Sequence, residues 1–325
     1  MSNNISDGKM FAYMDRVIGD RRPITADVFL TNYCNNKCPY CTYGRWELDP
    51  GARYMKYEDF IKYAERLTEL GVQGIILSGG GEPTLDKDFN MITAWLEATN
   101  RHYGINTNFN ELKFFSPDYL KVSLDGWDEE SYKAHRGVCR YQQVRENILA
   151  YDRWRKIHST KTALGIQAIL NTVEEVYKFY EANKDLPVDY ISIRPIESTL
   201  GKYYRDLQYA KDTNGYRPEE LRQAIRYLMD LDSRVIYNFK WDLIDHIESE
   251  CIGQWAEIAL NEKGEVIYCC HKPYEIVGHI MDPDILEKKA NAITNMAMCD
   301  VPCRLSAPNI EIRKMLEPKK DIFFI

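Results

Sequence analysis

The stretch ITADVFLTNYCNNKCPYC at residues 24–41 carries the features that decide the fold. Its first part, residues 24–30, is a short apolar run that predicts a strand. Cys34, Cys38 and Cys41 follow in the next loop with the spacing C-x3-C-x2-C. Three thiolates on one loop can bind three irons of a cubane cluster and leave the fourth iron open. The spacing alone also suits a zinc site or a structural iron–sulfur loop.

The rest of the N-terminal two thirds alternates short apolar runs with longer amphipathic segments. Further strands are predicted at 74–77, 103–106, 119–124, 162–170 and 190–194, and helices at 57–70, 90–98, 129–135, 141–156, 173–183 and 218–231. Strands that alternate with helices predict a parallel sheet built of βα units. Ligands of such sheets bind at the carboxyl ends of the strands, where the cysteine loop falls.

The pattern changes after about residue 235. A hairpin is predicted from 257–260 and 266–268, and loops rich in cysteine and proline follow. We therefore expect two domains, 1–234 and 235–325. The second domain is small, and bound metal would help to stabilise it.

Composition places the chain among ordinary globular proteins, with 45% apolar and 28% charged residues in 325. The net charge of −7 disfavours sequence-independent binding to nucleic acid. No apolar run is long enough to span a membrane, and residues 1–7 do not resemble a signal peptide, so a cytoplasmic location is expected. Nine cysteines in such a chain favour metal ligation or catalysis over disulfides.

Several motifs give the cysteine loop a more specific interpretation. Tyr40 precedes the last cysteine, and the loop resembles the signature of radical S-adenosylmethionine (SAM) enzymes. Gly80-Gly81-Glu82-Pro83 resembles the GGEP motif of that superfamily, and Ser123-Leu124-Asp125-Gly126 resembles its S-x-D-G motif. Arg136-Gly137 is similar to the end of H-x-x-x-R-G, although His135 here directly precedes the arginine. The resemblance covers about residues 24–200, with the motifs in the expected order.

The resemblance implies a partial (β/α)6 TIM-type barrel with a catalytic [4Fe–4S] cluster on Cys34, Cys38 and Cys41. It implies that SAM is bound by Tyr40, Gly80, Gly81, Glu82, Pro83, Asn106, Ser123, Asp125, Arg136, Leu170 and Arg194. Ordinary structural roles remain open for several of these residues. Glu82 could lie in a common glycine-rich turn, Asp125 could cap a helix, and Arg194 could form an ion pair.

The implied reaction begins when one electron from the cluster cleaves SAM into methionine and a 5′-deoxyadenosyl radical. That radical then removes a hydrogen atom from the substrate. An external one-electron reductant of the flavodoxin or ferredoxin type is implied as a partner.

A second cysteine group lies on both sides of the predicted hairpin. Cys251 is followed by twelve residues, Gly264, four residues and Cys269, and Cys299-x3-Cys303 comes later. This arrangement is similar to the SPASM and twitch extensions of radical SAM enzymes, which implies one auxiliary [4Fe–4S] cluster on these four cysteines. The alternative is a four-cysteine zinc site. Cys139 and Cys270 are left over, and each is a candidate hydrogen donor to a substrate radical or a small buried residue.

Three functions remain open at this point. The first is oxidation, crosslinking or epimerisation of a ribosomally made peptide, with a separate peptide-recognition protein as a potential partner. The second is dehydrogenation or rearrangement of a small molecule such as an aminocyclitol, sugar or nucleoside. The third is a non-catalytic iron–sulfur or zinc protein, which would not cleave SAM.

Overall fold

The computed structural model describes residues 13–41, 43, 51–195, 198–199, 218–243, 246, 248–296 and 299–317. The six predicted strands are confirmed within one or two residues. They are β1 (Thr25–Val28), β2 (Gly74–Leu77), β3 (His102–Thr107), β4 (Tyr119–Ser123), β5 (Ala163–Ile169) and β6 (Tyr190–Arg194).

The six predicted helices are also present. They are α3 (Tyr57–Leu70), α4 (Phe89–Ala98), α5 (Glu129–Arg136), α6 (Tyr141–Ile157), α7 (Val173–Asn183) and α9 (Pro218–Leu231). The start of α7 shows why the sequence marks this boundary, because Thr172 and Glu175 bond each other's backbone N–H groups in a capping box. Within the described residues, three further α-helices were not predicted, namely α2 (Met14–Asp20), α10 (Ile285–Ala290) and α11 (Ser306–Leu316).

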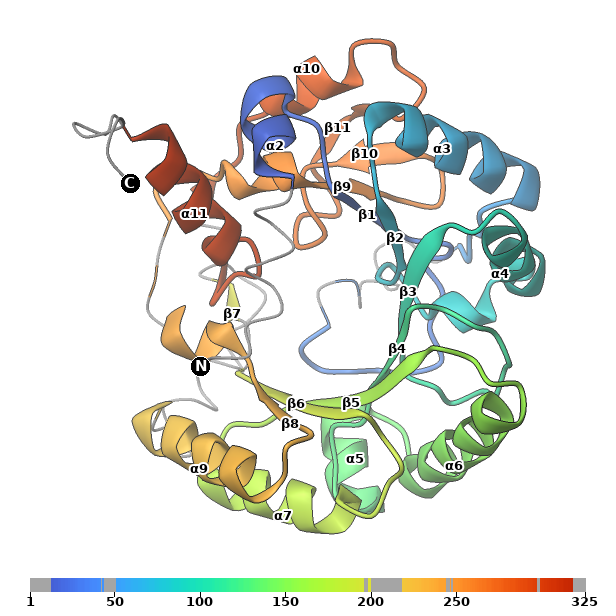
Figure 1. Ribbon diagram of the computed structural model, residues 1–325, viewed down its shortest axis with the longest axis vertical. Coiled ribbons are helices and arrows are strands. Elements are labelled where there is room, and N and C mark those ends of the chain that lie inside the picture. Colours follow the sequence, from blue (N-terminus) through green and yellow to red (C-terminus); the bar gives the residue numbers. More distant parts are fainter. Residues whose placement is uncertain are drawn as a thin grey trace.

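The strands form one curved sheet in the order β11-β10-β9-β1-β2-β3-β4-β5-β6-β8. Its additional members are β8 (Val235–Tyr237), β9 (Glu257–Leu260), β10 (Glu265–Ile267) and β11 (Ile276–His279). All neighbours from β9 round to β8 are parallel, and the sheet curves around a central space with α3, α4, α6, α7 and α9 outside it (Figure 1). The architecture is therefore a partial TIM-type barrel.

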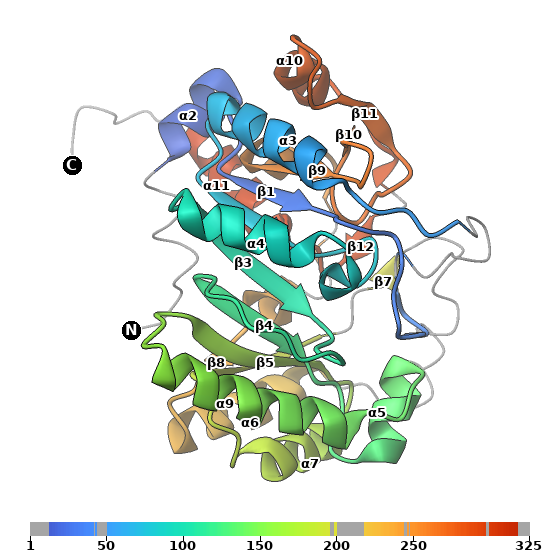
Figure 2. The same ribbon diagram turned by 90° about the vertical axis from the view of Figure 1, so that its right-hand side faces the viewer.

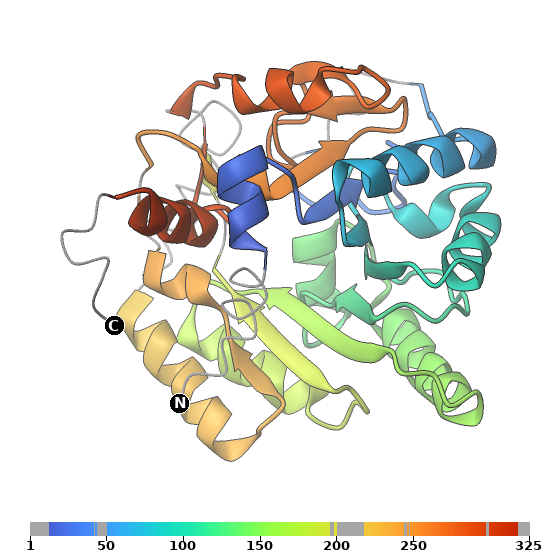
Figure 3. The same ribbon diagram turned by 45° about the horizontal axis from the view of Figure 1, so that its top comes forward.

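The C-terminal part of the chain extends this sheet. The predicted hairpin is confirmed as the antiparallel pair β9 and β10, but β9 also lies parallel to β1, in a register that pairs Thr25 with Glu257. On the opposite edge, β8 pairs with β6. The sheet thus continues on both sides of the predicted domain boundary at residue 234, which stays a prediction. The helices α2 and α11, from opposite ends of the described chain, contact each other (Figure 3).

Side chains alternate between the two faces of the barrel wall. Ala26, Val122 and Ile166 belong to the hydrophobic core. Lys121 and Gln167, each next to one of these in sequence, line the central cavity instead. Because the strands are parallel, their carboxyl ends meet at one edge, as the arrowheads of β1 and β3 show in Figure 2. A short two-stranded sheet of β7 (Ser198–Thr199) and β12 (Asp300–Val301) completes the described strands.

Candidate active site

The first cysteine loop is fixed by a network of asparagines. The side chain of Asn108 donates to Asn35 Oδ1 over 2.7 Å, and that of Asn110 donates to Asn36 Oδ1 over 2.6 Å. Asn35 and Asn36 lie between the first two cysteines, whereas Asn108 and Asn110 directly follow β3. The end of β3 therefore holds the loop in place mainly through the asparagines between the first two cysteines.

The turn after α5 supports the same loop from its other side. The N–H of Lys37 donates to the carbonyl of Arg136 over 2.9 Å. Gly137 has a φ of +73°, and a Cβ there would lie 2.4 Å from the carbonyl oxygen of Lys37. Only glycine fits such a close approach. The Arg136-Gly137 pair is thus explained by packing against the cysteine loop.

The thiol sulfurs of this loop accept hydrogen bonds from neighbouring N–H groups. Asn108 Nδ2 lies 3.7 Å from Cys34 Sγ, and Arg136 Nη1 lies 3.6 Å from Cys38 Sγ. Burial raises the pKa of the Cys34 thiol to about 12, with a further contribution from the charge of Glu82. Bound metal would offset that cost, because metal ligation deprotonates a thiol outright.

The cysteine sulfurs are not gathered at the spacing of ligands around one zinc ion. Four thiolates around one zinc ion, at 2.3 Å each, lie about 3.8 Å from one another. Among the described residues, which include all nine cysteines, no three sulfurs lie within 4.8 Å of one another. A cubane cluster needs the wider spacing because each cysteine binds a different iron. The three-cysteine loop can supply one thiolate to each of three irons.

Asp125 connects three parts of the site. Its Oδ2 accepts a hydrogen bond from the Tyr40 hydroxyl over 2.5 Å and forms an ion pair with Arg136. Its Oδ1 accepts from the N–H of Ile169 over 2.8 Å. Arg136 in turn reaches Cys38. The end of β4, the end of β5 and the cysteine loop are thus joined through the buried Asp125 and the partly buried Arg136. The alternative role of Asp125 as a helix cap is taken by Asp128, which caps α5.

Glu82 is buried and lies at the turn after β2. Its carboxylate accepts bonds from the N–H and hydroxyl of Thr84, from the hydroxyl of Thr107 at 2.5 Å and from the N–H of Asn108 at 2.7 Å. Burial raises the pKa of this carboxyl, and the four bonds oppose that rise. Glu82 thus ties the turn after β2 to the end of β3, next to the cysteine loop. The assignment of Glu82 to the SAM amino group stays a prediction.

A cavity of about 440 Å³ opens beside the cysteine loop inside the barrel. Cys38, Cys41 and Tyr40 line it, together with the predicted SAM residues Asn106, Ser123, Arg136 and Arg194. Asn106 Oδ1 and Arg136 Nε are buried here and have no hydrogen-bond partner within the described structure. Such orphaned polar atoms fit a polar ligand such as SAM. Leu170, the residue after β5, is fully buried in the hydrophobic core and does not line this cavity.

The second cysteine group gathers around a small apolar cluster. Cys251 and Cys303 pack beside Cys269, together with Tyr268 and Leu305. Cys299 lies close enough to raise the pKa of the Tyr268 hydroxyl, as Cys251 and Cys269 also do, although burial is the main cause. Two sulfurs accept hydrogen bonds, Cys303 from the N–H of Leu305 at 3.3 Å and Cys251 from Asn309 Nδ2 at 3.9 Å. The chain therefore brings the four predicted ligands to one region.

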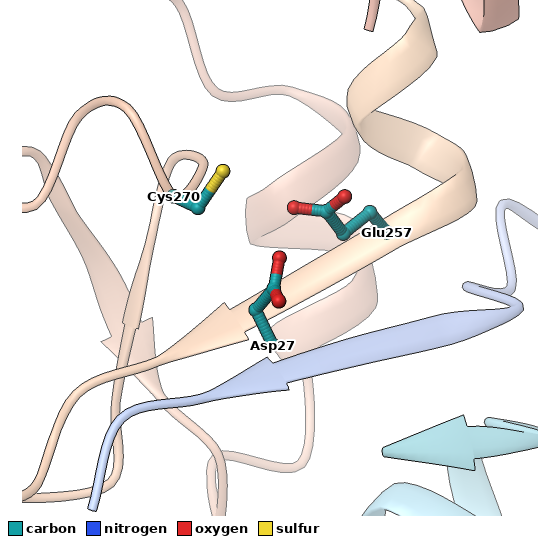
Figure 4. A group of neighbouring side chains, drawn as sticks. All are labelled: Asp27, Glu257 and Cys270. Atoms are coloured by element: carbon teal, nitrogen blue, oxygen red, sulfur yellow. The ribbon is translucent and has the colours of Figure 1, made fainter. Parts of the chain in front are cut away.

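The two leftover cysteines differ in position. Cys270 is buried and lines the central cavity, whereas Cys139 is exposed and does not line it. The Cys270 thiol lies within 4.8 Å of carboxylate oxygens of Asp27 and Glu257, and the three side chains point toward one another (Figure 4). Arg304 forms ion pairs with both carboxylates, 2.6 Å from Asp27 Oδ2. The Arg304 guanidinium therefore occupies the position that a metal cation would need. Arg304, Asp27 and Glu257 form an ion-pair cluster beside Cys270.

Sequence reasoning missed the residues that complete this cluster and the inner cavity wall. Asp27 interrupts an apolar strand, and Lys121 interrupts another in the same way. A buried charge in such a run is a usable signal, because alternation places it on the face opposite the core. Arg304 directly follows Cys303, but nothing local predicts that it pairs with a residue 277 positions earlier.

Comparisons with known proteins agree with this geometry. Residues 28–179 match the family model described as the radical SAM superfamily. A GTP 3′,8-cyclase of Stenotrophomonas maltophilia is 29% identical over 154 residues, which cover 44% of this chain and 44% of the relative. The chain spans about half the length of the curated relatives it matches.

Two solved structures share the fold. SuiB of Streptococcus suis, bound to the precursor peptide SuiA, superposes with a TM-score of 0.61 at 15% sequence identity. The superposition covers 88% of this chain and 68% of the SuiB chain. The structure of anSMEcpe with bound AdoMet and a peptide superposes with a TM-score of 0.57 at 17% sequence identity. The superposition covers 85% of this chain and 81% of the anSMEcpe chain.

The fold and the loop define an iron–sulfur protein built on an open parallel barrel. Residues 28–179, which contain the three cysteines of the loop, match the family model and so carry a radical SAM domain. Proteins of this superfamily use a [4Fe–4S] cluster and SAM. No helix in the described ranges is long and apolar enough to cross a membrane.

Proposed function

We propose that this chain cleaves SAM reductively and transfers the resulting radical to a small polar molecule bound inside the barrel. The observation that carries the proposal is the cavity beside Cys38 and Cys41, which is lined by polar side chains from β3, β4, β5 and β6. A substrate in this cavity would lie next to SAM and apart from bulk water, as a primary carbon radical requires.

The chain's own residues would prepare the site as follows. Cys34, Cys38 and Cys41 would hold the catalytic cluster, which when bound supplies the electron that breaks the carbon–sulfur bond of SAM. Asn106, Ser123 and Arg136 present polar atoms to the space beside it and would orient SAM. The Asp125 carboxylate would fix Arg136 and Tyr40 in place, so it acts on SAM through its neighbours.

Cys251, Cys269, Cys299 and Cys303 would hold the auxiliary cluster. Cys270 follows one of these ligands and faces the cavity, which suits a hydrogen donor that returns an atom to a substrate radical. Its thiol pKa is raised well above the ordinary value by burial, so the S–H form that such a donor needs is favoured. Cys139 is exposed and does not face the cavity, and its assignment as a hydrogen donor stays a prediction.

A peptide substrate is the second candidate. SuiB, whose structure was determined with a precursor peptide, has a fold that superposes on 88% of this chain. Against this, the cyclase relatives are named for a nucleotide reaction, and the cavity has the size of a small molecule. A peptide would have to insert a single side chain.

The test uses protein reconstituted anaerobically with iron and sulfide. We expect about eight irons per chain, corresponding to two [4Fe–4S] clusters. With dithionite as a substitute for the flavodoxin or ferredoxin type of reductant, the protein should form 5′-deoxyadenosine from SAM. If no deoxyadenosine forms with any reductant, with or without candidate substrates, the chain is a non-catalytic metal protein and the proposal is wrong. A count of about four irons per chain would mean that the auxiliary cluster is absent, and would leave the rest of the proposal standing.

A further inference from the structure

The inner wall of the cavity is strongly basic. Lys121 on β4, Arg194 at the end of β6, Lys240 in the 3-10 turn η2 (Phe239–Leu243) and Arg304 before α11 all line it. Within the described part of the chain, no aspartate or glutamate lines the cavity. Cationic side chains from four separate elements thus converge on one space.

Two of the cavity's cations are neutralised by carboxylates behind the wall. Arg304 is paired with Asp27 and Glu257, and Arg136 is paired with Asp125. Lys121 differs, because its ammonium forms no ion pair or hydrogen bond with any described residue and only faces the ring of Tyr119 at 5.9 Å. The positive charge of this wall is therefore not balanced at Lys121.

The position of Lys121 separates it from the predicted SAM residues. It precedes Ser123 by two residues on β4, so both side chains face the cavity, and Lys121 lies about 7 Å deeper in the barrel. Lys240 approaches the cavity from beyond β6, where the indole N–H of Trp241 bonds the carbonyl of Ile193 over 2.8 Å and fixes the turn. The lysines thus lie where the far end of a substrate would reach.

Keeping Lys121 charged costs free energy while no anion is bound in the cavity. The pKa of Lys121 is lowered to about 7, first by burial and then by the charges of Arg194, Arg304 and Lys240, whereas Asp27 opposes the change. A buried ammonium surrounded by like charges gains most from a bound anion.

We propose that the Lys121 end of the cavity binds an anionic oxygen group, phosphate or carboxylate, of the molecule that receives the radical. This inference rests on the proposed function and narrows its substrate class to small anionic molecules. Phosphate and carboxylate present the same chemistry to an ammonium, namely charged oxygens that accept short hydrogen bonds.

The test measures anion binding to the reconstituted holoenzyme by calorimetry, with saturating SAM and no reductant. The probes are pyrophosphate and succinate, with uncharged adenosine as the neutral comparison. We expect one anion to bind, and replacement of the lysine in Lys121→Met should weaken its binding about tenfold, because one charge-assisted bond is lost. Lys240→Met, on a different element, should also weaken it. Lys62→Met removes an equal charge from the exposed face of α3 and should leave binding unchanged.

Each outcome decides the proposal. Tighter binding of pyrophosphate supports a phosphate ester, and tighter binding of succinate supports a carboxylate. The proposal fails if neither anion binds, if both lysine variants bind as the wild type does, or if the anion displaces SAM. Circular dichroism of each variant confirms that it is folded, and Lys121→Arg should retain binding. Deoxyadenosine formation by the wild type needs none of these anions, so failure of the proposed function would be seen separately.

Discussion

The two cysteine groups are assembled in different ways. Cys34, Cys38 and Cys41 lie on one loop of eight residues, whereas the second group comes from three separate segments around residues 251, 269 and 299–303. The first loop is held by polar bonds from β3 and α5, and the second surrounds an apolar cluster. A local site can be read from spacing alone, but a distributed site exists only when the surrounding chain is folded.

The largest expected effect separates the two groups by activity. Cys38→Ala should lower deoxyadenosine formation at least about 100-fold and reduce iron from about eight to about four per chain, because it removes a ligand of the SAM-binding cluster. Cys303→Ala should lose a similar amount of iron but retain cleavage of SAM in the absence of substrate. Iron analysis and product chromatography give both values. Cys139→Ala, at an exposed position, should keep all the iron. If Cys303→Ala loses SAM cleavage as completely as Cys38→Ala does, the two groups are not functionally distinct.

Metal removal should distinguish the groups by stability. When a site is distributed over the chain, the free energy of metal binding is also free energy of folding. Chelation of iron should therefore abolish hydrogen-exchange protection around residues 251–305 while β2 to β6 stay protected. The thermal midpoint of Cys303→Ala should fall by more than about 5 °C, and that of Cys38→Ala by less. Equal loss of protection in both regions would contradict this difference.

A smaller effect is expected on the cluster potentials. Arg136→Lys cannot contact both Asp125 and Cys38, since a lysine has no planar fork of donors. Loss of the N–H bond to Cys38 should lower the reduction potential of the first cluster and leave the second unchanged. Asn309→Ala is the matched variant, because Asn309 donates to Cys251 and should shift only the second cluster. Redox titration followed by electron paramagnetic resonance can assign each shift, and a joint shift in either variant would show that the sites are coupled.

The smallest expected effect concerns support of the first loop. Asn110→Ala removes a buried 2.6 Å bond to Asn36 and should destabilise the protein by about 1–3 kcal/mol. Iron content should be unchanged, since no ligand is lost. Denaturant unfolding of the holoprotein measures the difference, with Asn261→Ala in the β9–β10 turn as a comparison outside the site. Loss of iron in Asn110→Ala would mean that the asparagine network, rather than the thiols alone, determines cluster binding.

The sequence predicts the local features of this protein well. Six strands and six helices are found where apolar periodicity indicates them, and the capping box at Thr172 shows how short-range bonding encodes a boundary. The parallel pairing of β9 with β1 could not be predicted, because it depends on contacts between residues far apart in the chain. The same applies to Arg304, whose partner Asp27 is known only from the folded sheet. Leu170 is buried and does not line the cavity, and its assignment to SAM stays a prediction.

The pairing of β9 with β1 has a consequence during synthesis. The edge of β1 has no neighbour on that side until roughly 230 further residues have been made, which takes on the order of 10–50 s at cellular rates of translation. An open strand edge of this kind invites pairing with other chains. Asp27 places a charge in the middle of that strand. Before it pairs with Arg304, Asp27 would therefore protect the nascent chain from aggregation, because β9 has not yet been synthesised.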